Sequence, residues 1–426
     1  MTDKYTALML LIFPLWTGLG GYADITRWKF VFFAAATAIW AVLLIFFAFR
    51  ERQAPNWPRG FAILAAVLAA WACVSALASP FGTDTLMGHN YGGLIPLLLY
   101  IAVALGCAGY GQWRDNYVNY IAISVTLCCL VAVLQLCGLN PLWLYPEGVD
   151  YYDAGVLYTG SFLGTMGNTN LLGAFLCLAA PVLAYTAVQK RGKSLWLLVP
   201  AVLAVAVIML SRSEAGLVGI STALLVCIPY YVNKNGHRRT ALFILALEAA
   251  LVLLALAAVY FFPPASGTLY ELHEMLHGRI RGEFGSSRVA IWSEALRLVA
   301  ERPLTGGGPG TFGLRSTLEF TRFVPETGAT LTTVADNAHC ELLSVLVDLG
   351  VPGALLYLVI LGYVIWRWFK GSAPAAGLAL ISYWAQAFFG IGTCFVLPFV
   401  AILSGLVSAQ PFVEETKKRG RVQRRR

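Results

Sequence analysis

Charged residues are scarce in this chain, and their scarcity excludes the soluble globular proteins. Asp, Glu, Lys and Arg make up 12% of the 426 residues, about half of the roughly 25% that is usual in soluble domains. Hydrophobic residues make up 58% of the chain, and the mean hydropathy is +0.71. This composition is typical of a polytopic membrane protein. We therefore expect one integral membrane domain over residues 1–426, embedded in a lipid bilayer, without a separate soluble enzyme domain.

Metal-binding and redox motifs are missing as well. The nine cysteines show no C-x-x-C spacing, so the sequence offers no zinc or thiol–disulfide motif. Most of them lie in apolar runs, where cysteine acts as a small buried residue. His273 and His277 are four residues apart with glutamates nearby, but the pattern is not H-E-x-x-H. We expect no metal site and no cofactor.

Apolar runs of helical length predict about twelve membrane spans, and hence an all-α, polytopic membrane helix bundle. The runs lie at residues 6–22, 28–49, 60–79, 93–110, 117–138, 167–188, 195–211, 215–232, 240–262, 339–369, 374–391 and 394–412. The first run lacks a clear cleavage site, so we interpret it as a retained span. The run at 339–369 is too long for one straight crossing of a ~30 Å hydrocarbon core. We expect Gly350 and Pro352 to break it.

Basic residues gather in alternate loops, which predicts the orientation of the chain. With the N-terminus inside, the inside loops carry Arg50, Arg52, Arg59, Arg114, Lys190, Arg191, Lys193, Lys234, Arg238, Arg239, Arg367, Lys370 and the tail cations from Lys417 to Arg426. One outside loop is acidic and carries Glu147, Asp150 and Asp153. The positive-inside rule then places both termini in the cytoplasm. The net charge of +8 is explained by this topology, and we expect no nucleic-acid partner.

The one long polar stretch, residues 263–338, is therefore predicted to be a large extracytoplasmic loop that contains helices. It holds Arg279, Arg281 and Arg288 and ends at His339, where the next apolar run begins. Arginine binds phosphates and carboxylates through paired hydrogen bonds. We expect this loop to bind or transform an anion.

Arg288 is predicted to open a helix in this loop. Apolar residues follow it at helical spacing and form one face: Val289, Trp292, Leu296 and Val299. Ser286 or Ser287 can cap the helix. An arginine in the first turn opposes the helix dipole unless an anion binds there; the alternative is an ordinary surface arginine. The glycine-rich segment 302–310 follows this helix and lacks the P-loop pattern, so we expect a turn and not a phosphate cradle.

Three more polar positions have two interpretations each. Arg212 lies in a short turn at the outer face, where it either faces a cavity or pairs with Glu214. Asn168 stands at the outer end of a span, where it either lines a cavity or caps the helix.

His339 is the third of these positions. It follows Asp336 and Asn337, either of which can cap the next helix, so we expect His339 in the first turns of that helix. Its imidazole can accept a proton near neutral pH. The alternative is an interfacial histidine bound to a backbone carbonyl.

The order of these motifs resembles the O-antigen ligase and O-antigen polymerase superfamily of bacterial membrane glycosyltransferases. Three stretches carry the resemblance: Ser211-Arg212-Ser213 before a glycine-containing span; Arg288-x-x-x-Trp292 followed by residues 302–312; and His339 with Leu342, Leu343, Gly350, Pro352 and Gly353. They cover about 150 residues. One departure is that the family commonly has His-Asn, whereas Cys340 follows His339 here. Either Asn337 supplies the amide from the preceding turn, or that role is dispensable.

The resemblance implies a reaction at the outer face of the cytoplasmic (inner) membrane. A polyprenyl-diphosphate-linked glycan is the donor, and a hydroxyl of a glycan, a lipid-core sugar or a protein is the acceptor. Such enzymes resemble metal-independent, inverting transferases. Arg212 and Arg288 would neutralise the leaving diphosphate, His339 would deprotonate the acceptor, and Arg281, Asn337, Asn168 and Trp292 are further candidates for substrate binding.

Two other functions are compatible with the sequence. A polyprenyl-linked glycosyltransferase could use a metal held by Asp24 in the first outer loop. A transporter of lipid-linked glycan would have no transferase activity, but transporters often contain internal repeats, and none is found here.

Overall fold

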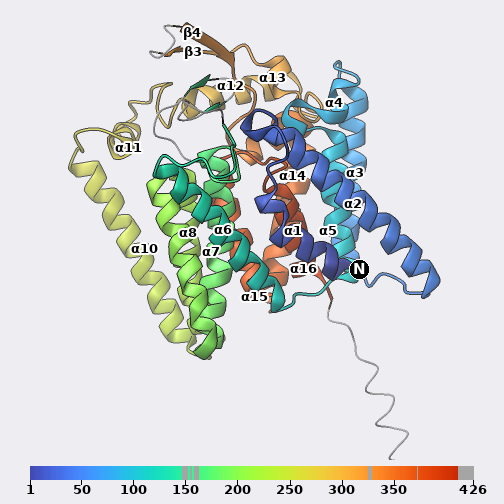
Figure 1. Ribbon diagram of the computed structural model, residues 1–426. Coiled ribbons are helices and arrows are strands. Elements are labelled where there is room, and N and C mark those ends of the chain that lie inside the picture. Colours follow the sequence, from blue (N-terminus) through green and yellow to red (C-terminus); the bar gives the residue numbers. More distant parts are fainter. Residues whose placement is uncertain (146–151, 154–155, 158–162, 325–328, 372, 411–426) are drawn as a thin grey trace, which may run out of the picture.

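A computed structural model describes residues 1–145, 152–153, 156–157, 163–324, 329–371 and 373–410. The chain forms a bundle of long helices, and the shorter elements of residues 263–338 gather at one end of it (Figure 1). The longer helices are α1 (Thr2–Leu11), α2 (Ile25–Arg50), α3 (Arg59–Ala78), α5 (Leu94–Tyr110), α6 (Asn116–Leu136), α7 (Thr169–Lys190), α8 (Leu198–Leu210), α9 (Glu214–Lys234), α10 (Arg238–Phe261), α14 (Glu341–Phe369), α15 (Pro374–Ala387) and α16 (Leu397–Ser408). The predicted helical membrane bundle is confirmed in this general form.

The predicted number of twelve spans is not confirmed. Eight helices of the described residues are long and apolar enough to cross a membrane. A ninth span results if α4 and its extension (Asp84–Tyr91) are joined to α5 across a bend of 79°. At three expected spans the helices α1, α15 and α16 have only 10, 14 and 12 residues. At 1.5 Å per residue they reach about 15–21 Å, short of a ~30 Å core.

The first apolar run illustrates why continuous hydrophobicity did not give a continuous helix. Helix α1 ends at Leu11, and a short 3-10 helix at Phe13–Leu15 contains Pro14. The buried Lys29 of α2 donates hydrogen bonds of 2.8 Å to the carbonyl oxygens of Phe13 and Pro14. Thr165 donates a third, of 2.7 Å, to Pro14. These donors satisfy the carbonyls at the broken end of the helix, as buried backbone groups require.

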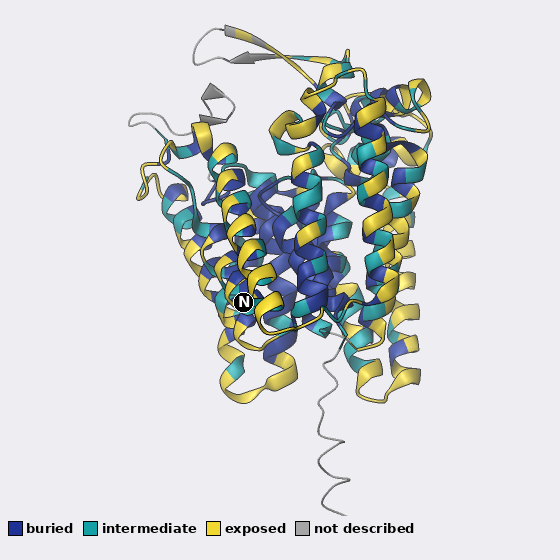
Figure 2. Cartoon of the chain, turned by 90° about the vertical axis from the view of Figure 1, so that its right-hand side faces the viewer, coloured by how far each residue is buried: buried dark blue, intermediate teal, exposed yellow. Residues whose placement is uncertain are grey.

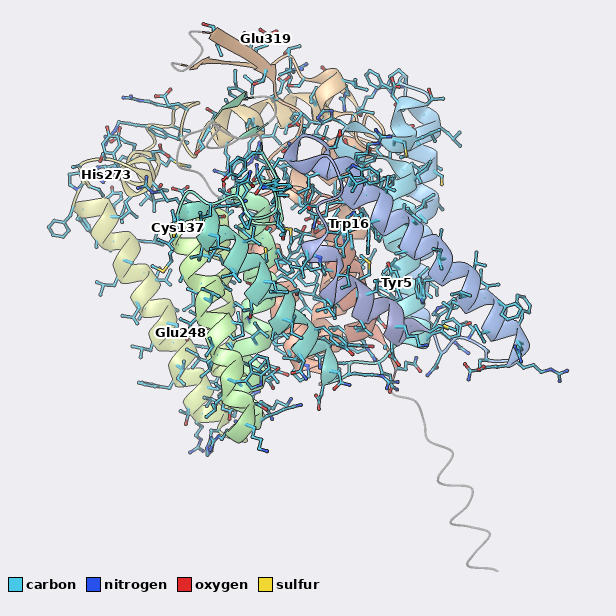
Figure 3. All side chains as sticks on the ribbon, in the orientation of Figure 1. Tyr5, Trp16, Cys137, Glu248, His273 and Glu319 are labelled. Carbon is cyan, nitrogen blue, oxygen red and sulfur yellow. The ribbon has the colours of Figure 1, made fainter. Side chains whose placement is uncertain are left out.

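Helix α7 lies at the centre of the bundle and α10 at its edge. In the apolar window of α7, 89% of the residues are buried, whereas the corresponding value for α10 is 0%. Helices α15, α9 and α8 pack around α7, and the buried residues concentrate in the middle of the molecule (Figure 2). Glu248, a carboxylate within an apolar run, lies on the peripheral α10 (Figure 3).

The predicted break in the run at 339–369 is confirmed at Gly350. Its φ of 67° and ψ of −175° interrupt α14, and the glycine-rich segment after α12 packs against the interruption. Gly307 and Gly308 donate backbone hydrogen bonds to the carbonyls of Val347 and Asp348, at 2.9 and 3.0 Å. A Cβ at Gly350 would lie 2.1 Å from the carbonyl oxygen of Leu304, so the two backbones cross where only glycine fits. The glycine-rich segment is a turn, as predicted.

The described part of residues 263–338 contains three helices. It also contains a hairpin, which the sequence did not predict. The helices are α11 (Thr268–Leu276), α12 (Arg288–Glu301) and α13 (Phe312–Arg315). Strands β3 (Glu319–Val324) and β4 (Ala329–Val334) pair antiparallel, with Glu319 opposite Val334. A second pair, β1 (Tyr152–Asp153) with β2 (Val156–Leu157), is only two residues long. The elements between α10 and α14 therefore form a cap on the bundle end (Figure 1).

The predicted apolar face of α12 is partly wrong. Its buried positions are Ile291, Glu294, Ala295 and Leu298, with Trp292 and Val299 packed beside them. Leu296, which was assigned to that face, is 57% exposed. The helix buries a stripe shifted by one residue because its neighbours are Phe312, Ala335 and Val347, partners that the local spacing could not specify.

Two ion pairs join predicted cytoplasmic residues to neighbours. Arg114 pairs with Asp3 at 2.6 Å, and Lys190 pairs with Asp115 at 2.6 Å. The N-terminus lies away from the cap of residues 263–338 (Figure 1). The tail cations from Lys417 to Arg426 and the acidic residues Glu147 and Asp150 lie outside the described residues. The side of the membrane on which each end lies stays a prediction.

Candidate active site

Arg288 begins α12 and is fixed by backbone carbonyls. Its Nη1 donates to the carbonyl of Gly285 at 2.8 Å, and its Nε donates to Phe389 at 3.2 Å, in the connection between α15 and α16. The expected serine cap is absent: Ser287 is the N-cap with φ 65°, and its side chain makes no capping hydrogen bond. Burial lowers the pKa of Arg288 below its ordinary value, and the carboxylate of Glu214 opposes this shift. Arginine remains protonated at physiological pH, so a partly buried cation stands at the N-terminus of α12.

His339 lies just before α14 and not in its first turn, which corrects the prediction. Helix α14 begins at Glu341, and its N-cap is Cys340, which makes no side-chain capping bond. Neither Asp336 nor Asn337 caps the helix. Instead, the Asn337 Oδ1 accepts the backbone N–H of His339 at 2.9 Å. His339 has φ 45°, a left-handed conformation that is uncommon outside glycine and is a frequent mark of functional positions.

The positive charge of Arg288 acts on His339. Burial lowers the pKa of His339 from its ordinary 6.5, the positive charge of Arg288 lowers it further, and Asp336 acts in the opposite direction. The structure thus brings together two of the predicted catalytic residues from separate elements. With a lowered pKa, the imidazole is neutral near pH 7 and is able to accept a proton.

A polar cluster around Asp336 also lies near His339, and half of it was missed by sequence reasoning. The Asp336 Oδ2 is 3.0 Å from the His89 Nε2 and accepts a longer bond of 3.4 Å from the Asn90 Nδ2. The Asp336 Oδ1 accepts from the Asn337 Nδ2 at 2.5 Å. Burial raises the pKa of Asp336, but His89 and His339 lower it more, so the net shift is downward. We call His89, Asn90, Asp336 and Asn337 the cavity mouth.

The cavity mouth opens on a cavity of about 290 Å³ that continues between α3, α5, α14 and α16. Its deeper wall is apolar and includes Phe61, Leu68, Ile101, Leu349, Ile360 and Val400. Its polar lining includes Glu341, Asp348 and Ser344 besides the mouth residues, and no Lys or Arg of the described chain belongs to it. The lining residues come from helices that are far apart in the sequence, so no local motif could have predicted the cavity.

Glu341 is a buried carboxylate that the sequence analysis did not single out. It is 9% exposed, and it accepts hydrogen bonds from the Tyr357 and Tyr383 hydroxyl groups at 2.8 and 2.5 Å. Carboxylates inside membrane proteins are costly and usually functional. The signal in the sequence was its position two residues after His339, at the start of an apolar helix.

Arg212 is exposed in the turn between α8 and α9, with φ 53°. The expected alternative, a pair with Glu214, does not form, because the Glu214 Oε1 instead accepts from Thr268 at 2.5 Å. Within the described residues the guanidinium of Arg212 makes no hydrogen bond or ion pair. The carboxylate of Glu214, two residues later, raises the pKa of Arg288. The turn that holds Arg212 is therefore near Arg288.

The other predicted binding residues divide into two groups. Trp292 packs against Phe388 and Phe389, with ring centroids 5.9 and 6.0 Å apart, and its buried Nε1 lacks a hydrogen-bond partner in the described chain. Asn337 belongs to the cavity mouth. Arg281 is not part of this arrangement: it is exposed and lies 3.9 Å from Glu283.

Asn168 caps α7, which was one of its two interpretations. Its Oδ1 accepts the backbone N–H groups of Asn170 and Leu171, at 2.8 and 3.4 Å. It is not among the residues that line the cavity. The capping role accounts for this asparagine without a substrate.

The described residues include no group of three or more His, Cys, Asp and Glu side chains able to hold a metal. The His273 Nδ1 bonds the Val259 carbonyl at 2.7 Å, and the His277 Nδ1 bonds the His273 carbonyl at 2.8 Å. Asp24, the metal ligand of the alternative mechanism, is exposed next to Gly20.

Residues 199–358 match the family model described as O-antigen ligase, which confirms the resemblance drawn from the sequence motifs. The matched region runs from α8 to α14 and includes Arg212, Arg288 and His339. A search among curated proteins finds no match to the chain. The family match supports O-antigen ligase-like glycan transfer as the general activity of this region.

Proposed function

We propose that this protein transfers a glycan from a polyprenyl-diphosphate-linked donor to an acceptor hydroxyl, at the outer face of a bacterial cytoplasmic membrane. The observation that carries the proposal is the placement of two residues on different elements of the region matching the O-antigen ligase family: Arg288, partly buried at the N-terminus of α12, and His339, held with a positive φ just before α14. A fixed cation beside a neutral imidazole is what this reaction requires. The acceptor is a glycan, a lipid-core sugar or a protein.

The donor diphosphate binds next to Arg288. The leaving group carries several negative charges, and a partly buried arginine at a helix N-terminus stabilises such an anion. The unpartnered Nε1 of Trp292 can donate one further hydrogen bond, because Trp292 lies one turn after Arg288 on the same helix. Arg212, exposed and unpaired with the described chain, adds a second guanidinium. Arginine carries out this neutralisation without a metal because its charge is fixed.

His339 acts as the general base in a single displacement. The acceptor oxygen forms a bond to the anomeric carbon while the bond between that carbon and the diphosphate oxygen breaks. The electron pair leaves with the polyprenyl diphosphate, and the hydroxyl proton passes to the imidazole. One displacement of this kind inverts the configuration at the anomeric carbon. Asn337 holds the backbone of His339, and it takes the place of the asparagine that follows the histidine in the resembling family.

Reconstituted protein supplied with a polyprenyl-diphosphate-linked oligosaccharide tests the proposal. Arg288→Ala, Arg212→Ala and His339→Ala should each abolish glycan transfer, whereas Arg239→Ala, an exposed arginine at the start of α10, should not. Full activity in all three site variants would overturn the mechanism.

The same assay distinguishes the two alternative functions. Loss of transfer in EDTA with rescue by Mn²⁺ or Mg²⁺ would favour the metal mechanism through Asp24. Movement of the lipid-linked glycan across vesicles without glycan transfer would favour a transporter.

A further inference from the structure

Arg288 stands directly after a turn whose backbone is strained. Gly285, Ser286 and Ser287 follow one another with φ of 64°, 57° and 65°. Left-handed residues normally occur singly, and a serine in this conformation is uncommon. Such a run persists only when the surrounding structure holds it. The turn matters for the site because the Gly285 carbonyl oxygen accepts the hydrogen bond of 2.8 Å from the Arg288 Nη1.

A carboxylate of α11 bonds to this turn. The Glu271 Oε2 accepts the backbone N–H of Gly285 at 2.7 Å. The N–H of Gly285 therefore bonds to a carboxylate, and its C=O bonds to a guanidinium. Hydrogen bonds to charged groups are shorter and stronger than those between neutral groups. Glu271 thus reaches Arg288 through one backbone residue, since no hydrogen bond or ion pair joins the two side chains in the described chain.

Helix α11 is itself fixed near both of its ends. At its start, the Thr268 hydroxyl donates to the Glu214 Oε1 at 2.5 Å, at the beginning of α9. In its last turn, the buried His273 (labelled in Figure 3) donates from Nδ1 to the Val259 carbonyl of α10 at 2.7 Å. Glu214 lies two residues after Arg212. Helix α11 is therefore anchored to α9 and α10 and contacts the elements next to both candidate arginines.

We propose that Glu271 is a positioning residue for glycan transfer, which holds the strained turn 285–287 so that the Arg288 guanidinium stays in place for the donor diphosphate. The inference rests on the proposed function, and it gives a role to α11, to which no residue of the predicted site belongs. An arginine side chain has much rotamer freedom, and the carbonyls of Gly285 and Phe389 restrict it here. The first of these carbonyls moves if the turn relaxes. Glu271 therefore acts on the orientation of the cation, and the chemistry stays with Arg288.

The kinetics of glycan transfer by the reconstituted full chain test the proposal. Glu271→Ala removes the acceptor of the Gly285 N–H, and we expect kcat to fall about tenfold, the effect of losing one hydrogen bond to a charged group, with the KM for acceptor unchanged. Glu271→Gln should recover most of that loss, because its amide oxygen still accepts the N–H. Glu283→Ala is the matched control: this glutamate lies in the same loop with its side chain 71% exposed, and kcat should not change.

The coupling to Arg288 distinguishes positioning from a general contribution to stability. In the Arg288→Lys background, Glu271→Ala should lower kcat by less than about twofold, because lysine has no Nη1 to bond the Gly285 carbonyl and the effects of residues in one network do not add. A further tenfold loss in that background would show that Glu271 acts elsewhere and would overturn the proposal. Full transfer by Glu271→Ala, when Arg288→Ala is inactive, would overturn it as well.

Hydrogen–deuterium exchange reports on the turn without any glycan transfer. The Glu271 carboxylate protects the Gly285 amide, so the peptide covering residues 282–291 should exchange about tenfold faster at that amide in Glu271→Ala and at the normal rate in Glu283→Ala. Unchanged exchange in Glu271→Ala would contradict the tether. Full transfer by Arg288→Ala would refute the proposed function but would leave the exchange result standing, so the two failures are distinguishable. Glu271→Asp, one methylene shorter, replaces Glu271→Ala if that variant does not fold.

Discussion

Two regions next to His339 differ in charge. In the first, Arg288 is fixed by backbone carbonyls, and the buried indole N–H of Trp292 on the same helix has no partner in the described chain. In the second, Asp336, Glu341 and Asp348 line a cavity whose described lining includes no Lys or Arg. His339 experiences both regions, because the charge of Arg288 lowers its pKa and Asp336 raises it. The comparison teaches that this histidine stands at the boundary between a cationic region and a carboxylate-rich one.

The largest effect is expected for His339→Ala. Loss of a general base reduces rates by about 10²- to 10⁴-fold, and glycan transfer by reconstituted protein measures it. Arg239→Ala, the exposed arginine at the start of α10, should leave transfer unchanged. Full transfer by His339→Ala would contradict the role of the imidazole as base.

Arg288→Ala should reduce transfer by roughly 10²- to 10³-fold, the usual effect of removing one group that stabilises a developing charge. Arg288→Lys should recover only part of this loss, because an ammonium group cannot reproduce the planar fork that reaches Gly285 and Phe389. The measurement is kcat with donor and acceptor saturating. Full recovery by lysine would show that only a point charge is needed.

Gly350→Ala should disturb the contact between α14 and the segment that follows α12. The new Cβ would lie 2.1 Å from the Leu304 carbonyl oxygen at a φ of 67°, so this segment must move away from α14. Strain of this kind costs about 1–3 kcal/mol. Thermal inactivation in detergent should occur at lower temperature, with glycan transfer lost in parallel. Gly236→Ala, whose Cβ would meet no atom within 4 Å although its φ is also positive, controls for backbone strain alone.

The pH dependence of glycan transfer tests whether Arg288 and Asp336 set the pKa of His339. Burial and Arg288 lower the pKa of His339 below 6.5, so the neutral base persists below that pH, and transfer should fall only under more acid conditions. Asp336 raises this pKa, so Asp336→Asn should shift the acid limb to still lower pH, as measured by kcat against pH. A shift to higher pH would contradict the sign. His89, the other titratable partner of Asp336, is controlled by His89→Gln.

The smallest effect is expected for Tyr357→Phe, which removes one of the two hydroxyl donors of Glu341. Tyr357 lines the cavity. A single hydrogen bond to a charged group contributes about 1.5–3 kcal/mol at most, and Tyr383 keeps its bond. We expect a rise in the KM for acceptor with little change in kcat. A fall in kcat at unchanged KM would assign Glu341 to the chemistry instead.

The sequence predicted the arginines and His339 better than it predicted the residues of the cavity. Arg212, Arg288 and His339 were recognisable because they lie in one stretch of the chain, in motifs with a known order, and that stretch is the one matching the O-antigen ligase family. His89, Asn90 and Glu341 were missed. The first two come from the segment before α5 and meet Asp336 only through the fold.

Errors in the helices have a similar origin. The prediction placed His339 inside α14 and Leu296 in the buried face of α12, because local spacing cannot specify which neighbour an element meets. It counted three spans where α1, α15 and α16 have only 10, 14 and 12 residues. At α1, an apolar composition does not show the short 3-10 helix at Pro14 or the buried Lys29 that binds its carbonyls.

Composition and periodicity by themselves determined that this chain is a helical membrane protein with one polar segment, 263–338, and where α14 breaks. These properties depend on hydrophobic transfer and on glycine's freedom at positive φ, which act residue by residue. The tertiary structure alone decided that Arg288 and Asp336 both act on His339, and that Asp336 lines one cavity with Glu341 and Asp348. Charges act through space, and the fold sets the distances over which they do so.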